Sequence, residues 1–183
     1  MDKIFDLNLV RWTVDKRGLP EAYYKIKTPS VSAILNLIPD PELEIWVQKV
    51  GKAVADEIMT QASYRGTALH TFIEQFIGTY SKTKDASEAL RMTQTQSPQI
   101  LQKQNIPINK IDEGRDLFYK FYYSEFPTKY SETIAMELGL YSPSLFYRGK
   151  LDVFFKERIF GLAITDFKTS NGYIKKENRD QAP

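Results

Sequence analysis

Cysteine is absent from this chain of 183 residues, and histidine occurs only once, as His70. The absence of cysteine excludes disulfides, thiolate zinc sites and iron–sulfur clusters. A bound metal would therefore be held by carboxylates, by the imidazole or by backbone oxygens, and ligands of this kind suit Mg²⁺ or Mn²⁺.

Long apolar runs are also absent, since no run approaches the ~20 residues that cross a bilayer. The first residues include Asp2 and Asp6 and no apolar stretch typical of a signal peptide. We expect a cytoplasmic protein of a prokaryote or a phage-infected cell, without membrane association. Hydrophobic residues make up 42% and charged residues 26%, an ordinary balance for a globular chain of one domain, residues 1–183.

A strong charge of one sign is lacking too, because the formal net charge is only +2. Nucleic acid would then be bound through local basic patches and not through the whole surface. The basic residues that cluster along the chain are Lys25, Lys27, Lys150, Lys156, Arg158, Lys175, Lys176 and Arg179. Each cluster is equally compatible with ordinary solvated surface charge.

Helical spacing dominates the first half of the chain. Residues 1–27 predict an extended or hairpin segment, and Pro41 with acids behind it predicts a helix over residues 41–62. A further helix begins near Gly66 and places a run of apolar residues on one face. His70 and Glu74 are four residues apart, so they are neighbours at the edge of that face.

The second half predicts a sheet. Residues 81–107 are polar and weakly patterned, which indicates a lid over a site or a disordered loop. A helix over residues 110–125 follows, and strands are expected over residues 130–140, 146–155 and 161–168. Residues 173–183 read as the start of a helix. This order of elements predicts an α/β or α+β fold.

The last two predicted strands carry residues of opposite charge on defined faces. Because side chains alternate along a strand, Asp166 and Lys168 share one face. If the strands pair with Asp152 beside Asp166, two carboxylates and an ammonium converge. A divalent cation would relieve the repulsion between the carboxylates and activate water, with the Phe167 carbonyl and either Glu74 or His70 as further ligands. Lys168 would position the water or stabilise negative charge on phosphorus.

Several motifs occur in an order typical of one nuclease family. They are Thr28-Pro29-Ser30, Arg65-Gly66-Thr67-Ala68-Leu69-His70 with Glu74, Glu137, Gly149-Lys150-Leu151-Asp152 and Thr165-Asp166-Phe167-Lys168-Thr169-Ser170. Over about residues 28–181 the chain resembles the RecB-like exonuclease branch of the PD-(D/E)xK nucleases. Within this branch it resembles the group of mitochondrial genome maintenance exonucleases and their phage relatives.

The resemblance implies a restriction-endonuclease-like core, in which helices flank a central mixed sheet. It also implies hydrolysis of DNA by one or two Mg²⁺ or Mn²⁺ ions, on single strands or free ends. His70, Asp152, Asp166 and the Phe167 carbonyl would bind metal, Lys168 would be the catalytic lysine, Glu74 would support the metal or position water, and Glu137 would have a supporting role. The residues expected to contact DNA are Arg65, Arg148, Lys150, Thr169, Ser170 and Gln181.

The chain departs from the family pattern in two respects. A Gln-x-x-x-Tyr helix that holds DNA in relatives would begin at Gln181, but the sequence ends at Pro183, so this helix is expected to be truncated. The four-cysteine iron–sulfur cluster of many relatives is excluded. No nucleotide-binding Gly-x-x-x-x-Gly-Lys-Ser/Thr motif is present, so a helicase or recombination partner would be a separate protein. We expect a monomer.

Two alternatives to an exonuclease stay open. One is an endonuclease of the same superfamily, and the other is a DNA-binding or partner-binding module without turnover. The grouped aromatic residues, such as Tyr119, Phe121 and Tyr123, would either stack on bases or fill the core.

Overall fold

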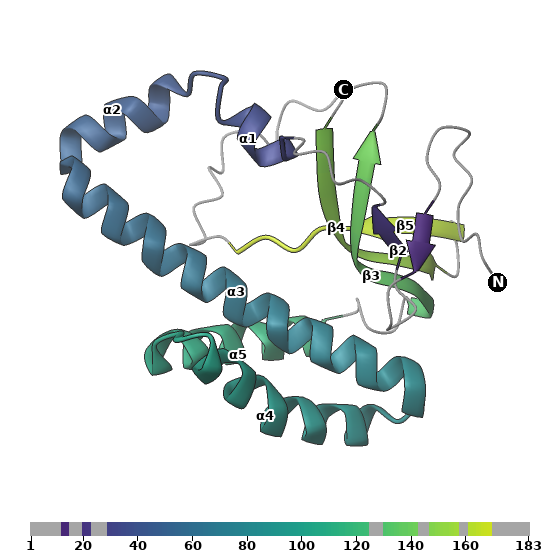
Figure 1. Ribbon diagram of the computed structural model, residues 1–183. Helices are drawn as coiled ribbons and strands as arrows, with labels where there is room; N and C mark the ends of the chain where they lie inside the picture. The colour runs from purple at the N-terminus through teal and green to yellow at the C-terminus, as the bar shows by residue number, and fades with distance from the viewer. Residues whose placement is uncertain are drawn as a thin grey trace, which may run out of the picture.

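The computed structural model describes residues 12–14, 20–22, 29–124, 130–142, 147–157 and 161–169. This part of the chain has an α+β fold (Figure 1). Its helices are α1 (Val31–Leu35), α2 (Pro41–Val50), α3 (Lys52–Thr83), α4 (Ala86–Lys103) and α5 (Ile108–Tyr122). Its strands are β1 (Trp12–Val14), β2 (Pro20–Ala22), β3 (Tyr130–Ser142), β4 (Tyr147–Glu157) and β5 (Gly161–Thr165). β1 pairs with β2, as the predicted N-terminal hairpin requires, and β3, β4 and β5 form a three-stranded sheet.

Helix α3 is longer than the sequence pattern predicts. The helix expected over residues 41–62 ends at Val50, and a new helix begins at Lys52 and continues to Thr83. Gly51 separates them with φ 86°, a backbone conformation that side-chain-bearing residues rarely adopt. The two expected helices are therefore divided at a different point, and α3 includes half of the first expected helix, residues 52–62.

Residues 81–107 are mostly helical, so the alternative of a disordered loop is wrong, and a lid over the site stays a prediction. Asp85 starts α4 by accepting hydrogen bonds from the backbone amides of Ser87 and Glu88. Its buried stripe recurs every four residues and consists of Ala89, Thr93, Ser97 and Leu101. Small and hydroxyl-bearing residues make up most of this stripe, so hydropathy alone did not reveal it.

The main core lies around the C-terminal half of α3. Figure 1 shows α3 between the sheet on one side and α4 and α5 on the other, and all of these elements contribute buried side chains to one cluster. Gly114 allows α5 to approach closely, because a Cβ atom there would lie 2.4 Å from the Cβ of Ala68 on α3. The predicted apolar face of α3, including Leu69, Phe72 and Ile73, is confirmed as buried.

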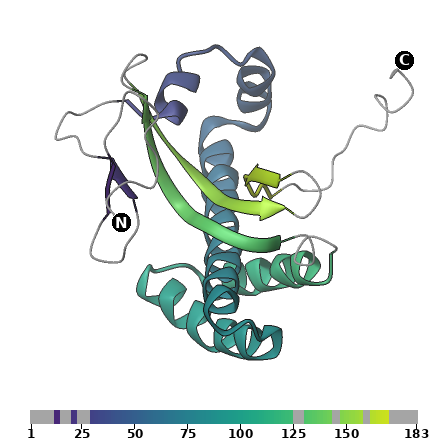
Figure 2. The same cartoon turned by 90° about the vertical axis from the view of Figure 1, so that its right-hand side faces the viewer.

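β3 and β4 bend across α3 (Figure 2), and the buried residues on either side of this bend belong to two separate clusters. Val153 and its partner Met136 pack against the α3 core, whereas the next pair, Leu151 and Leu138, belongs to a separate cluster. All named strands of the described residues pair antiparallel, and the parallel pairing found there is the isolated bridge between Ser30 and Arg148. The predicted mixed sheet is therefore not present in this part of the chain.

The third predicted strand is shorter than expected. β5 ends at Thr165, and residues 166–169 continue without regular structure. The C-terminal helix expected from residue 173 lies outside the described residues. None of the helices in the described ranges combines the length and the apolar character needed to cross a membrane.

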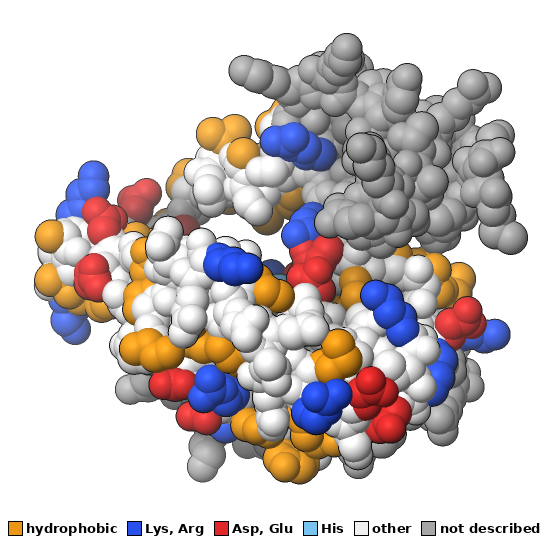
Figure 3. All heavy atoms as spheres, turned by 60° about the horizontal axis from the view of Figure 1, so that its bottom comes forward, with side chains coloured by type: hydrophobic (Ala, Val, Ile, Leu, Met, Phe, Trp, Pro, Cys, Tyr) orange, Lys and Arg blue, Asp and Glu red, His pale blue; other side chains and the backbone are white. Residues whose placement is uncertain are grey.

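Charges of both signs are interspersed on the face formed by α4 and α5. Figure 3 shows basic and acidic side chains mixed there, with no extended patch of one sign. Of the predicted basic clusters, Lys150 and Lys156 are exposed on β4. The other members, including Lys25, Arg158 and Lys175, lie outside the described residues.

Candidate metal centre

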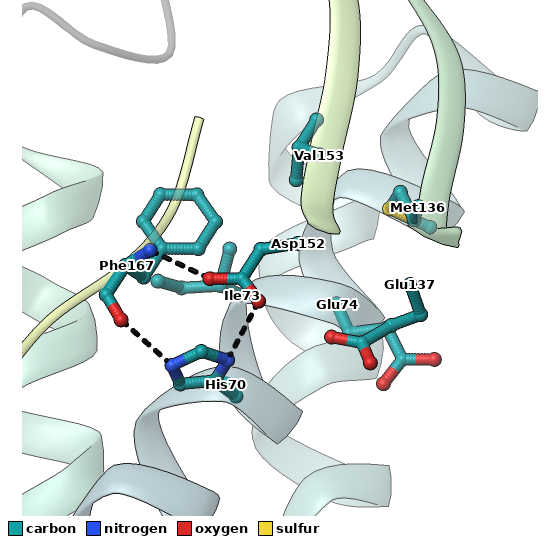
Figure 4. Close-up of a pocket in the computed structure, with 8 residues that line it drawn as sticks. All are labelled: His70, Ile73, Glu74, Met136, Glu137, Asp152, Val153 and Phe167. Carbon is teal, nitrogen blue, oxygen red and sulfur yellow. Dashed lines mark hydrogen bonds and ion pairs between the residues drawn. The ribbon is translucent and has the colours of Figure 1, made fainter. Parts of the chain in front are cut away.

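A small pocket lies at the bend of the sheet, against α3 (Figure 4). His70, Ile73 and Glu74 come from α3, Met136 and Glu137 from β3, Asp152 and Val153 from β4, and Phe167 from the segment after β5. The volume of this cavity is only about 10 Å³. The pocket therefore suits a single ion or water molecule and excludes an organic ligand.

His70 is oriented by the backbone of Phe167. Its Nε2 atom lies 2.9 Å from the carbonyl oxygen of Phe167. Because a carbonyl oxygen can only accept, Nε2 carries the proton and donates. A second hydrogen bond of this kind is the usual support of a metal-binding histidine, since it fixes the ring and leaves the other nitrogen free to coordinate.

The other ring nitrogen of His70 faces Asp152. Nδ1 lies 3.6 Å from Oδ1 of Asp152, which is too long for a hydrogen bond. A neutral Nδ1 and an ionised carboxylate both present lone pairs, so a proton or a metal ion between them makes the contact favourable. An ion about 2.1 Å from each atom would fit this separation.

Asp152 is fixed by the same backbone segment. Its second oxygen, Oδ2, accepts a hydrogen bond from the amide of Phe167 over 2.6 Å, and its side chain is only 12% exposed. One carboxylate oxygen is thus engaged by the protein, and the other points toward His70 (Figure 4). Phe167 holds both His70 and Asp152 through its main chain.

Glu137 lies opposite Asp152, between the pairs Met136–Val153 and Leu138–Leu151. Its φ of 53° is a left-handed conformation, which costs about 1–3 kcal/mol for a side-chain-bearing residue. Ligand atoms of His70, Glu137 and Asp152 all lie within 4.8 Å of one another. Glu137 also forms an ion pair with Lys150 on β4.

Glu74 points into the same pocket, from the turn of α3 that follows His70 (Figure 4). Its side chain is exposed, and it is not a member of the three-residue group. The predicted proximity of Glu74 to His70 is confirmed. Glu74 is placed to contact water or a ligand next to the group.

Asp166 and Lys168 lie beside the pocket and do not line it. They form an ion pair of 2.8 Å, and their side chains are 52% and 79% exposed. The hydrogen bond to Asp166 raises the pKa of the Lys168 ammonium, partial burial lowers it, and the charges of Asp166 and Asp152 raise it further. Lys168 therefore stays a cation, within electrostatic reach of Asp152.

The predicted metal ligands are thus brought together in part. His70 and Asp152 meet as expected, but Asp166 is outside the group, and Glu137 takes its place. The Phe167 carbonyl bonds to His70. Asp166 lies outside the group because β5 ends before it. The ring of the next residue, Phe167, turns inward onto Phe121, at 5.6 Å between ring centroids.

The predicted DNA contacts have diverse environments. Arg65 is largely covered and lies 4.0 Å from Glu113 of α5, so it links two helices. Lys150 is exposed and pairs with Glu137, and Arg148 is exposed while its amide bonds to the Pro29 carbonyl over 3.0 Å. Thr169 is half-buried next to Lys168. Ser170 and Gln181 lie outside the described residues.

Comparison with known proteins gives no further assignment. No protein-family model matches the chain, and neither the curated proteins nor the solved structures contain a match to it. Functional interpretation therefore depends on the geometry of the site and on the motifs in the sequence.

Proposed function

We propose that this chain is a metal-dependent deoxyribonuclease that hydrolyses phosphodiester bonds, with a preference for single strands or free ends. The observation that carries the proposal is the group formed by His70, Glu137 and Asp152, which lies beside the cation Lys168. The order of the motifs along the sequence supports the same assignment. The restriction-endonuclease-like core is part of this proposal.

The donor set fits a divalent metal ion. One imidazole and two carboxylates offer three ligand atoms within 4.8 Å of one another, and open positions would be left for water and phosphate. When bound, the ion would act as a Lewis acid toward the phosphodiester and lower the pKa of water. Mn²⁺ fits best among the predicted ions, since it accepts imidazole more readily than Mg²⁺ does.

The residues around the ion have separate tasks in this proposal. The ammonium of Lys168 stabilises negative charge on the phosphate as the bond to the attacking water forms. Asp166 keeps Lys168 protonated and near the site. Glu74 is exposed on the open side of the pocket, where it can accept the proton of the attacking water.

A DNA-binding module without turnover is the second candidate. The observation in its favour is the ion pair between Lys150 and Glu137, because an ammonium already neutralises one of the acids. In that case the acids would be stable without metal, and DNA would bind independently of divalent ions. The two candidates differ in their need for metal.

The deciding experiment follows the release of nucleotides from end-labelled single- and double-stranded DNA in the presence of Mn²⁺ or Mg²⁺. We expect cleavage by the wild type and a loss of at least about a hundredfold for Lys168→Ala, which is too exposed to disturb folding. Lys120→Ala on the exposed side of α5 is the matched control and should retain activity. Equal activity of Lys168→Ala and wild type would refute the proposal, and binding without cleavage in any divalent ion would favour the second candidate.

An assay on closed circular single-stranded DNA distinguishes an exonuclease from the alternative, an endonuclease of the same superfamily. An exonuclease leaves the circle intact and degrades it only after linearisation. Cleavage of the circle at a rate similar to that of the linear strand would assign an endonuclease.

A further inference from the structure

A larger groove adjoins the candidate metal pocket. It lies between α3, α4 and β3 and has a volume of about 600 Å³. Glu74 and Met136 line both the groove and the metal pocket, so the two spaces are adjacent. The sequence motifs do not include the part of this groove that α4 contributes.

The volumes of the metal pocket and of the groove indicate which part of a substrate each could hold. The metal pocket holds an ion or a water molecule, so the sugar and base next to a bound phosphate must lie outside it. The groove has the volume of a typical small-molecule site, which is roughly 300–1,000 Å³. It can therefore accept the nucleoside part of one nucleotide.

The lining of the groove favours a base over a phosphate. Lys82 is its cation, but Glu74 and Glu88 are also in its wall, so the groove is not basic. Gln75 and Gln96 offer amides that both donate and accept hydrogen bonds.

Two methionines, Met92 on α4 and Met136 on β3, supply the apolar part of the wall. Thioether side chains are polarizable and pack well against flat rings. A nucleobase has two apolar faces and an edge of donors and acceptors, which matches methionines combined with amides. A phosphate would instead be held at the metal pocket and Lys168.

We propose that this groove is a nucleobase subsite, which holds the base of the nucleotide adjacent to the bond that is cleaved. The inference rests on the proposed nuclease function, and it adds residues of α4 to the substrate-binding surface. Gln96 would read the edge of the base, and Met136 would position the sugar next to the metal pocket.

Gly78 gives a direct steric test. A Cβ atom at this position would lie 3.2 Å from Cε of Met136, so a larger side chain would enter the groove. Ser63 is exposed on the same helix and lines neither the groove nor the metal pocket. Gly78→Leu is thus a blocking variant, and Ser63→Leu is its matched control. Likewise, Gln102 is exposed on α4 outside the groove, so Gln102→Ala is the control for Gln96→Ala.

The experiment compares two esters with the full chain and Mn²⁺. Thymidine 5′-(4-nitrophenyl phosphate) carries a base, and bis(4-nitrophenyl) phosphate does not. We expect kcat/KM for the thymidine ester to fall about tenfold in Gly78→Leu and about fivefold in Gln96→Ala, because a steric block and a lost hydrogen bond weaken base binding. The base-free ester should change less than about twofold in both variants, and the control variants should match the wild type.

A binding measurement makes failure of the subsite distinguishable from failure of the nuclease function. The affinity for thymidine 5′-monophosphate is measured by calorimetry with Mn²⁺, and we expect it to weaken about tenfold in Gly78→Leu. If the wild type cleaves neither DNA nor the esters but binds the nucleotide in a Gly78-dependent manner, the nuclease function fails and the subsite stands. If the esters are hydrolysed and the variants affect both equally or neither, the subsite is wrong and the nuclease function stands. Absence of both hydrolysis and binding overturns both.

Discussion

The backbone amide of Phe167 donates a hydrogen bond of 2.6 Å to Asp152. This bond joins the motif that ends at Asp152 to the Asp-x-Lys motif that contains Phe167. The carbonyl of the same residue accepts from His70 over 2.9 Å. The residue between Asp166 and Lys168, whose identity the Asp-x-Lys pattern leaves open, therefore fixes two of the three candidate ligands. Its ring packs edge-on against Phe121, so the hydrophobic core holds the backbone segment in place.

Phe167→Ala should therefore weaken metal binding although Phe167 offers no side-chain ligand. Loss of the ring contact with Phe121 would loosen the segment that orients His70 and Asp152, and loss of such support lowers metal affinity about tenfold or more. Calorimetric titration with Mn²⁺ measures the change. Tyr123→Ala removes an exposed ring at the C-cap of α5 and should leave the affinity unchanged. A Phe167→Ala protein that folds and binds Mn²⁺ as tightly as the wild type would show that the segment holds its position without the ring.

The sequence predicted the parts of the fold whose periodicity is carried by large side chains. The buried face of α3, the helix near residues 110–125 and the strands β3 and β4 follow from Phe, Ile and Leu at regular spacing. Helix α4 was missed because its buried stripe contains Thr93 and Ser97, which carry no hydropathic signal. Pro98 inside the helix further suggested irregular structure.

The sequence predicted only the part of the candidate site that follows from the pairing of neighbouring strands. The β4–β5 pairing places Val153 opposite Thr165, which brings the Asp152 region next to Asp166 as expected. The presence of Glu137 in the candidate metal group, in place of the expected Asp166, depends on where β5 ends and on the left-handed conformation of Glu137. Neither feature has a local sequence signal, since left-handed residues are usually glycine or asparagine.

His70 should determine which metal the site prefers. With one imidazole and two carboxylates, we expect Mn²⁺ to bind more tightly than Mg²⁺, because Mg²⁺ favours oxygen ligands. His70→Asp converts the group to three carboxylates and should reduce the ratio of Mn²⁺ to Mg²⁺ affinity about tenfold. The measurement is the shift of the unfolding temperature with each ion, since an ion at a hundred times its Kd stabilises the folded state by about 2.7 kcal/mol. An unchanged ratio would mean that the imidazole does not coordinate the metal.

The ion pair between Lys150 and Glu137 predicts opposite effects on metal and on DNA. In Lys150→Ala the ammonium no longer competes for Glu137, so Mn²⁺ affinity should rise about twofold to fivefold, as expected from removal of a weak exposed pair. If Lys150 also contacts DNA, the KM for DNA should rise and its dependence on salt should decrease. Titration with Mn²⁺ and assays at several salt concentrations separate the effects. A fall in Mn²⁺ affinity would contradict the competition, and Lys156→Ala on the same strand is the comparison for general loss of positive charge.

Gly114 should be intolerant of any side chain, because α5 touches α3 at that point. A Cβ atom would lie 2.4 Å from the Cβ of Ala68 and 3.0 Å from the backbone nitrogen of Leu69, so Gly114→Ala would force the two helices apart. We expect a loss of about 1–3 kcal/mol in the free energy of unfolding, measured by denaturation with urea. Gly66→Ala on α3 meets nothing within 4 Å and should stabilise the protein by about 0.5–1 kcal/mol through helix propensity alone. If both substitutions were stabilising by a similar amount, the close contact between α3 and α5 would not exist in solution, and His70, which α3 carries, would lose part of the support that fixes it.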